Sequence, residues 1–348
     1  MKQIKFKRWS YLLMLAGFFT FSACEREDLL IENERERLLR NAAEFLRNNY
    51  DFSLFNAAIE WVGMDESLRD NEADYTIFAP TNAAFNSIGV EFPSDFEKMD
   101  RDSLRFMLEY HILPSAVYLS DIGYEQADQL QENLTGRQLH LGRPAQPSTG
   151  VGGQFYVNGI QSRANNNNVN LSNGVLHGLD QVLRYRSGSV RDYLEALPEY
   201  RNFVALLKRF DYWDMLDEDR NWTIYALSNT VLENRGLSLD AIAELNVAEY
   251  DADLLLSVYL HPDQHLFTSD WLVVEARGGV FRRTRYGIYS IDMSGGRITV
   301  RVYPSTNTAV RVVQVSNTAT NYQVDYKADN GVIHGLGGMV VLPDEAKL

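Results

Sequence analysis

The chain of 348 residues is 45% hydrophobic and 23% charged, with a formal net charge of -14. These values are typical of a soluble globular protein long enough for two domains, and they exclude collagen-like, coiled-coil and largely disordered chains. The acidic balance makes nucleic acid an unfavourable partner, so none is expected. A single cysteine excludes an intrachain disulfide, and with six histidines it argues against a zinc site built on thiolates.

The N-terminal residues have the composition of a secretory signal. An apolar run at residues 11–21, shorter than the ~20 residues of a comfortable membrane span, is followed by Ser22, Ala23 and then Cys24. A basic start, a short apolar segment and small residues after it predict a cleaved signal peptide at 1–23. The basic residues, with no acid among them, are Lys2, Lys5, Lys7 and Arg8.

The residues before Cys24 resemble the lipobox of bacterial lipoproteins, although Phe21 stands where Leu is usual. The resemblance implies that the Cys24 thiol receives a diacylglycerol and that the membrane is a partner through this anchor. The alternatives are a plain signal peptide with an incidental cysteine, or a buried cysteine near the start of the fold. The residues after Cys24 resemble the acidic export tag of some Bacteroidetes lipoproteins, through Glu25, Glu27 and Asp28. We therefore expect a surface-exposed outer-membrane lipoprotein, with residues 24–33 as the anchor tether.

Two blocks of sequence occur twice, in the same order. Residues 75–85 (YTIFAPTNAAF) recur at 222–232 (WTIYALSNTVL), and residues 173–183 (NGVLHGLDQVL) recur at 330–340 (NGVIHGLGGMV). The copies lie roughly 150 residues apart, and a period this long indicates a duplicated domain rather than a solenoid.

These blocks resemble the signatures of the fasciclin (FAS1) family. The first signature is nearly intact at 76–85, the Tyr-His pair near a proline is Tyr110-His111, and the closing signature lies at 173–183. The resemblance implies an α+β fold of two consecutive FAS1-like domains, each a β-sandwich flanked by small helices. The expected boundaries are a first domain at 34–186, a second at 187–343 and a tail at 344–348.

The residues themselves also indicate helices and strands. Phe52, Phe55, Ile59 and Val62 fall on one face at helical spacing. The alternating stretches at 154–158 and 297–303 have the period of two that is typical of strands.

The second copy has diverged at several motif positions. Leu227 stands where the first copy has Pro80, so the fixed φ of an expected turn is lost. Tyr259 corresponds to His111. The short segment at 184–190 is expected to separate two domains that touch rather than swing freely.

We find no enzyme signature in the sequence, such as a nucleophile elbow, a phosphate-binding glycine loop or paired histidines on a helix. His261 and His265 are four apart, but Pro262 lies between them and disfavours a helix there. We therefore predict a non-enzymatic protein with no cofactor, no catalytic residues and no metal site.

Three histidines lie in apolar stretches: His111, His177 and His334. We interpret them as structural residues whose ring nitrogens satisfy nearby backbone groups, because unpaired burial is costly. The family resemblance suggests a second role for Tyr110 and His111, since this region has been linked with cell adhesion in animal members.

Two further stretches stand out. We interpret the asparagine-rich stretch, Asn165 to Asn168 with Asn170, as a solvated loop, because asparagine tolerates turn conformations. Sugar binding by its amides is a weaker alternative. Residues 277–311 hold seven arginines against the single acid Asp292. This stretch is either a set of solvated strand edges, a surface that meets the acidic first domain, or an anionic-ligand patch. The patch would consist of Arg282, Arg283 and Arg285.

Together these features predict a surface-anchored, non-catalytic adhesion or binding lipoprotein, with glycans or matrix proteins as its partners. The alternative is a carbohydrate-binding accessory protein of a polysaccharide-uptake system, which would expose aromatic residues such as Trp271, or Tyr286 with Tyr289. A third class, a hydrolase, would need clustered catalytic carboxylates.

Overall fold

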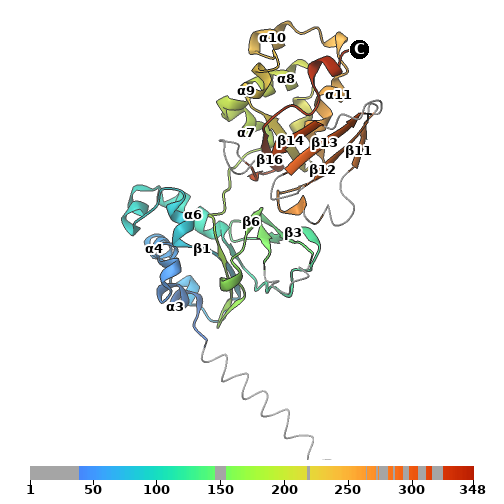
Figure 1. Ribbon diagram of the computed structural model, residues 1–348. Helices are drawn as coiled ribbons and strands as arrows, with labels where there is room; N and C mark the ends of the chain where they lie inside the picture. Colours follow the sequence, from blue (N-terminus) through green and yellow to red (C-terminus); the bar gives the residue numbers. More distant parts are fainter. Residues whose placement is uncertain are drawn as a thin grey trace, which may run out of the picture.

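The computed structural model describes residues 39–145, 154–217, 220–263, 265–271, 273, 281–284, 287–292, 298–304, 311–315 and 324–348. Between residues 281 and 315 it describes the backbone alone. Figure 1 shows the two halves of the chain as two lobes, the first coloured blue to green and the second yellow to red. Among the described residues, none of the helices has the length and apolar character needed to cross a membrane.

The helices of the first half are short, and their ends follow the local sequence. Asn41 and Asp100 accept backbone hydrogen bonds at the starts of α3 and α6, and Gly63 ends α4 in the left-handed conformation with φ 73°. The predicted apolar face of α4 is buried. The helices are α3 (Ala42–Arg47), η1 (Tyr50–Phe52), α4 (Ser53–Val62), η2 (Ser67–Arg69), α5 (Asn82–Asn86), η3 (Pro93–Lys98), α6 (Arg101–Tyr110) and η4 (Ala164–Asn166).

Two four-stranded sheets of the first half pack face to face. One has the order β2-β1-β8-β7, with β1 and β8 parallel, and the other has the order β3-β4-β5-β6. Phe78 and Leu179 of the first sheet join one buried cluster with Leu139, Leu141 and Val157 of the second. The strands are β1 (Tyr75–Pro80), β2 (Ile112–Leu113), β3 (Gln126–Glu132), β4 (Gln138–Arg143), β5 (Tyr156–Val157), β6 (Ile160–Gln161), β7 (Val169–Leu171) and β8 (Gly174–Leu179).

The second half repeats this arrangement. Its sheet has the order β10-β9-β16-β15 with β9 and β16 parallel, and a second sheet has the order β11-β12-β13-β14. The strands are β9 (Trp222–Leu227), β10 (Leu260–Pro262), β11 (Phe281–Thr284), β12 (Gly287–Asp292), β13 (Ile298–Pro304), β14 (Arg311–Val315), β15 (Tyr326–Ala328) and β16 (Gly331–Leu336). The helices are α7 (Val190–Ala196), η5 (Pro198–Tyr200), α8 (Arg201–Arg209), η6 (Asp214–Asp217), α9 (Asn229–Glu233), α10 (Leu239–Glu244), η7 (Val247–Glu249), α11 (Ala252–Leu256), η8 (Ser257–Tyr259) and η9 (Pro343–Glu345).

The repeated motif asparagines make the same kind of contact in both halves. Asn82 accepts from the Leu54 N–H, and Asn229 accepts from the Asn202 N–H, so each ties the start of one helix to the first residue of the short helix that follows a central strand. Asn173 and Asn330 open β8 and β16, and their amides bond backbone groups of the preceding helices. Each asparagine satisfies backbone groups that would otherwise be orphaned.

The predicted α+β class is therefore confirmed, with helices and paired sheets in the first half. One local expectation was wrong: Pro80 is the last residue of β1, paired with Leu179, rather than part of a turn. Thr81 then caps α5, with the Ala84 N–H donating to its hydroxyl. Residues 182–187 carry no regular structure between the halves, and the domain boundaries at 186 and 187 stay predictions.

Candidate functional site

Tyr110 and His111 are buried at the end of α6, with exposed fractions of 1% and 0%. His111 donates from Nδ1 to the Met107 carbonyl at 2.7 Å and accepts from the Leu183 N–H at Nε2 at 2.9 Å. Burial lowers the pKa of His111 to about 4, so the ring is neutral. The Tyr110 hydroxyl accepts from the Asn158 amide at 2.9 Å. The pair therefore supports the fold, and an adhesive surface of this half would have to be made by other, exposed side chains.

The structure explains the replacement of His111 by a tyrosine in the second half. The Tyr259 hydroxyl accepts from the Val340 N–H at 2.8 Å. Val340 occupies the position in its motif that Leu183 occupies in the first. A phenol oxygen thus takes the place of an imidazole nitrogen as the acceptor for one backbone N–H.

His177 and His334 have matching backbone partners. His177 donates from Nε2 to the Val117 carbonyl and accepts from the Asn168 N–H at Nδ1. His334 donates to the Leu266 carbonyl and accepts from the Asp325 N–H in the same way. The interpretation of these histidines as structural residues that satisfy backbone groups is confirmed.

The asparagine loop is held by hydrogen bonds to residues outside it. Asn168 has φ 58°, a left-handed conformation that asparagine tolerates, and its side chain accepts from the Leu119 N–H at 2.8 Å. Asn167 donates to the Ser162 hydroxyl at 2.9 Å. These two amides are engaged by residues outside the stretch, so they are less available to a sugar.

A hollow of about 500 Å³ lies beside the segment that joins the halves. Phe106 and Tyr185 line it with partly exposed rings whose centroids are 5.4 Å apart, and the Arg137 guanidinium lies 5.1 Å from the centre of the Tyr185 ring. The Asp329 carboxylate accepts from both Arg137 and the Tyr185 hydroxyl, which joins the second half to the first. This hollow combines two aromatic faces and a cation, and sequence analysis missed it because its residues carry no common pattern.

Several predicted site residues lie outside what the structure describes. Cys24 and the proposed anchor tether at 24–33 are outside the described residues, as are Arg285 and Tyr286. Arg282 and Arg283 lie on β11 and Tyr289 on β12, where only the backbone is described. The anionic-ligand patch stays a prediction. Trp271, by contrast, is 1% exposed, so the expectation that it offers an exposed aromatic surface was wrong.

A second polar cluster lies where β4 meets the second half. His140 of β4 is 4% exposed, its ring centroid lies 4.0 Å from that of His265, and its Nδ1 bonds Asp128. Burial lowers the pKa of both histidines, and it raises the pKa of Asp270 to about 7. His261, which the sequence spacing paired with His265, instead bonds the Val258 carbonyl at 3.1 Å. The sequence carried no signal for this cluster, because His140 and His265 share no motif or spacing.

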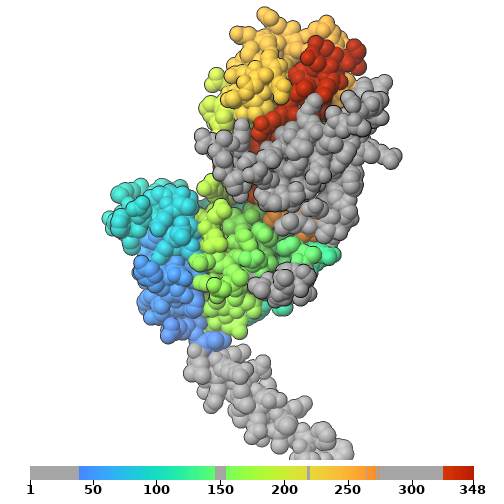
Figure 2. Space-filling view, viewed as in Figure 1, coloured from blue at the N-terminus to red at the C-terminus, as the bar shows by residue number. Residues whose placement is uncertain are grey.

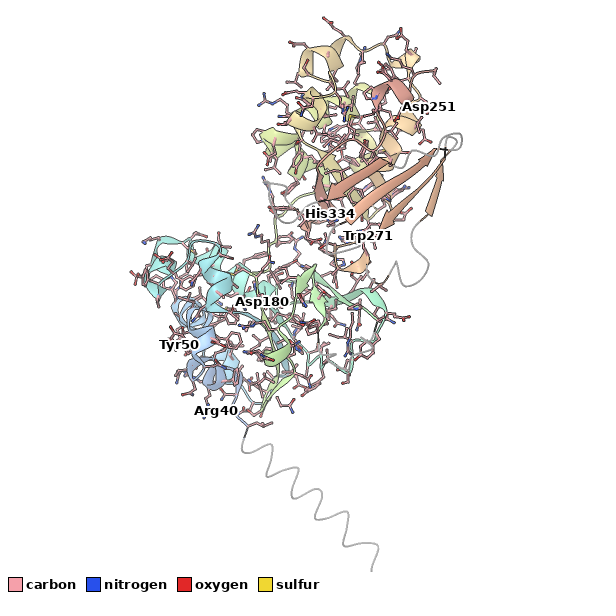
Figure 3. All side chains as sticks on the ribbon, in the orientation of Figure 1. Arg40, Tyr50, Asp180, Asp251, Trp271 and His334 are labelled. Atoms are coloured by element: carbon pink, nitrogen blue, oxygen red, sulfur yellow. The ribbon has the colours of Figure 1, made fainter. Side chains whose placement is uncertain are left out.

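Both halves meet closely at this cluster. A Cβ added to Gly142 would lie 2.7 Å from Asp270, and one added to Gly159 would lie 2.7 Å from Asp325. Figure 3 labels Trp271 and His334 in the part of the second lobe nearest the first. The prediction that the two parts touch agrees with these contacts and with the space-filling view (Figure 2).

A helical layer beside paired sheets, with motif asparagines that hold the helices to the central strands, defines a small α+β domain. Residues 50–185 match the fasciclin domain. The chain belongs to the fasciclin-domain family.

Several characterised proteins are similar to this chain. Transforming growth factor-beta-induced protein ig-h3 of Sus scrofa is 27% identical over 69% of this chain and 33% of its own length. Periostin of Homo sapiens is 24% identical over 80% of this chain and 29% of its own length. Protein sll1483 of Synechocystis is 30% identical over 40% of this chain and 71% of its own length. The chain thus spans about a third of the first two relatives. A solved FAS1 domain pair from the insect cell adhesion molecule fasciclin I aligns over 86% of this chain at 16% identity, with a TM-score of 0.34.

Proposed function

We propose that the protein is a non-catalytic adhesion or binding protein that is held at the cell surface by a lipid anchor. The observation that carries the proposal is the fasciclin domain at 50–185. The hollow beside Tyr185 is the surface we assign to the ligand, because aromatic rings and an arginine offer strong anchoring contacts.

The second half is, in this proposal, a diverged fasciclin domain. Three correspondences support it: the same sheet order around two parallel central strands, the same asparagine contacts, and the same backbone partners of His177 and His334. His177 has an identical counterpart in His334, and where His111 is replaced, the Tyr259 hydroxyl accepts from the corresponding backbone N–H.

The anchor is tested at Cys24. Only a thiol can form the thioether to diacylglycerol, so Cys24→Ser should abolish labelling by a radioactive fatty acid and release the protein from membranes. A tagged parent processed in the same cells serves as control. Equal label on the variant and the parent would contradict the lipid anchor.

Binding at the hollow is tested with a panel of matrix proteins and glycans on the mature protein. For any ligand that binds the parent, Tyr185→Ala and Phe106→Ala should each weaken binding about tenfold, as loss of an aromatic contact of ~1.4 kcal/mol would. Phe92→Ala is the matched control, since Phe92 is 61% exposed and does not line the hollow. A ligand that binds both variants as it binds the parent would place the binding surface elsewhere.

The same panel separates the second candidate, a carbohydrate-binding accessory protein. The partly exposed rings of Phe106 and Tyr185 favour it, because flat aromatic faces pack well against sugar rings. Binding of soluble oligosaccharides that depends on Tyr185, without binding to matrix proteins, would support this candidate over adhesion.

A further inference from the structure

The junction between the halves contains two buried imidazole rings in edge-to-face contact. His140 lies on β4 of the first half and His265 follows β10 of the second, and each is 4% exposed. Their ring centroids are 4.0 Å apart, with the planes inclined at 63°. The Nε2 atom of each ring is fully buried and has no hydrogen-bond partner among the residues that the structure describes. Buried nitrogens of this kind are costly, so a pair of them at one place calls for an explanation.

The partners of the other ring nitrogens determine the state of these Nε2 atoms. Nδ1 of His140 faces the Asp128 carboxylate, which can only accept while it is ionised, so Nδ1 carries the proton. His265 makes a hydrogen bond with the Gly331 backbone, and this bond favours the protonated ring, as a bond to a carbonyl does. The Nε2 atom of His265 is not the atom that makes this bond. In both neutral rings Nε2 is therefore a bare lone pair. Two buried lone pairs without donors, on rings whose centroids are 4.0 Å apart, are costly unless a cation binds them.

The backbone around Asp128 is shaped to bring its carboxylate to His140. Asp128 has φ 58°, and the ladder between β3 and β4 is irregular between Gln126 and Gln129. A bulge of this kind re-aims a side chain, and it often lies next to a functional site. A carboxylate on the outer nitrogen of a histidine is the usual support of a metal-bound imidazole.

The three side chains lie close together, so that two of them can bind one ion while Asp128 holds the His140 ring. Asp128, His140 and His265 can each bring one ligand atom within 4.8 Å of the other two. Ligand atoms in a tetrahedral zinc site lie ~3.4 Å apart, given metal–ligand distances of ~2.0–2.2 Å, so small side-chain movements would complete the site. The Asp128 side chain is 35% exposed, which leaves a route for the ion from solvent.

Acidic side chains and one lysine surround the cluster. The Asp128 carboxylate acts on His140, and the Lys327 ammonium acts on both rings. Burial raises the pKa of Asp270, which lies near Asp128, and that of Asp325, which lies near His334. Lys327 donates to the Ala328 carbonyl at 2.6 Å. A cation bound by the two rings would thus have the Asp128 carboxylate beside it.

We propose that His140 and His265 bind one divalent transition-metal ion of the zinc class through their Nε2 atoms, and that this ion links the two halves of the chain. Asp128 is a positioning residue that holds the His140 ring through Nδ1. Neutral imidazoles suit Zn²⁺, Cu²⁺ and Ni²⁺, whereas Mg²⁺ and Ca²⁺ prefer oxygen ligands. This proposal departs from the expectation that the protein has no metal site.

The proposal is tested on the full mature chain after treatment with EDTA and dialysis. Calorimetric titration with Zn²⁺ should show one equivalent bound, and Mg²⁺ should show none. Zn²⁺ should also raise the midpoint of thermal unfolding, because an ion that binds only the folded chain stabilises it. Cleavage by a protease at residues 182–187 should slow, since the ion ties the halves on either side of that segment.

Variants separate binding at this cluster from adventitious binding. His140→Gln and His265→Gln should lose the stoichiometric binding of Zn²⁺, and Asp128→Asn should weaken it about 10- to 100-fold. His261→Gln is the matched control: His261 is equally buried, lies on β10 close to His265 in sequence, and bonds a carbonyl instead of joining the cluster. It should keep the affinity of the parent.

Two results would overturn the proposal. One is a metal-free parent that binds no Zn²⁺, which would leave a proton shared between the two Nε2 atoms as the explanation of the pair. The other is Zn²⁺ binding that persists in folded His140→Gln or His265→Gln. If both variants fail to fold, Co²⁺ bound to the parent decides the question: absorption bands typical of tetrahedral nitrogen ligation support the site, and bands typical of six oxygen ligands reject it.

Discussion

At the scale of single residues, buried polar side chains explain why the repeated motifs persist. Thr76 accepts from the Val117 N–H at 2.7 Å, and Thr223 accepts from the Leu266 N–H at 3.0 Å. The same segments supply the carbonyls that His177 and His334 bond. Each motif residue completes the hydrogen bonds of an irregular segment, and a buried segment without such partners would be unstable.

His111 should make the stability of the protein depend on pH. Its ring must stay neutral to accept from the Leu183 N–H, and its pKa of about 4 in the folded chain lies below the ordinary value of 6.5. The unfolded chain therefore binds more protons between these values, so this stability is complete above pH 6.5 and is lost as the pH falls towards 4. Relative to His111→Gln, the parent should lose about 1.4 kcal/mol of unfolding free energy per pH unit in that window.

The measurement is urea unfolding of the parent and of His111→Gln at several pH values, with the difference between them plotted against pH. The subtraction removes the pH dependence that comes from the carboxyl groups, which both proteins share. A difference that stays constant from pH 6.5 to 4 would contradict a neutral buried ring.

At the scale of elements, short helices depend on their caps. Helix α5 has five residues, too few to be stable through helix propensity, and the Thr81 hydroxyl accepts from the N–H of Ala84. Ser228 makes the same contact with Val231 at the start of α9. The Thr-Asn and Ser-Asn dipeptides of the two copies thus combine a helix cap with the asparagine that holds a neighbouring helix.

We expect Thr81→Ala to reduce the free energy of unfolding by about 1 kcal/mol, because it removes the cap of α5. Thr81→Ser keeps the hydroxyl and should restore most of the loss. Urea unfolding of the three proteins measures the effect. If the serine variant were as unstable as the alanine variant, the lost methyl group and not the cap would be responsible.

At the scale of the whole molecule, the close approach of the halves depends on small residues. Gly142 lies on β4 against Asp270, and Gly159 lies against Asp325. These contacts bury the face of β4 that would be wet in an isolated domain, which explains why the residues of this strand from Leu139 to Arg143 are all buried.

We expect Gly142→Ala to destabilise the protein by about 1–3 kcal/mol, as an overpacked contact does. The added Cβ would lie 2.7 Å from Oδ1 of Asp270, and its next neighbour, the Gln126 carbonyl oxygen, is at 3.6 Å. In an Asp270→Ala background the same substitution should cost little, because the clashing atom is gone. A double-mutant cycle in urea measures the coupling. If Gly142→Ala lowered the free energy of unfolding equally in both backgrounds, Gly142 would be required for its backbone conformation and not for the contact between the halves.

The sequence by itself determined what depends on local patterns. The signatures at 76–85 and 173–183 and their copies indicated the family and the repeat, and apolar spacing placed the helix at 52–62 and the strand near 298. These features can be recognised because helices and strands each bury one face with their own periodicity. The motif residues can be recognised because they bond backbone groups at the same relative positions in both copies.

Only the tertiary structure decided which residues meet between the halves. His140 and His265, like Arg137 and Asp329, belong to different copies and share no spacing or motif, so nothing along the chain couples them. Trp271 was expected to offer an exposed aromatic surface if the protein binds carbohydrate, and packing buried it. Burial of a side chain depends on what lies against it in space, and here the covering surface comes from another part of the fold.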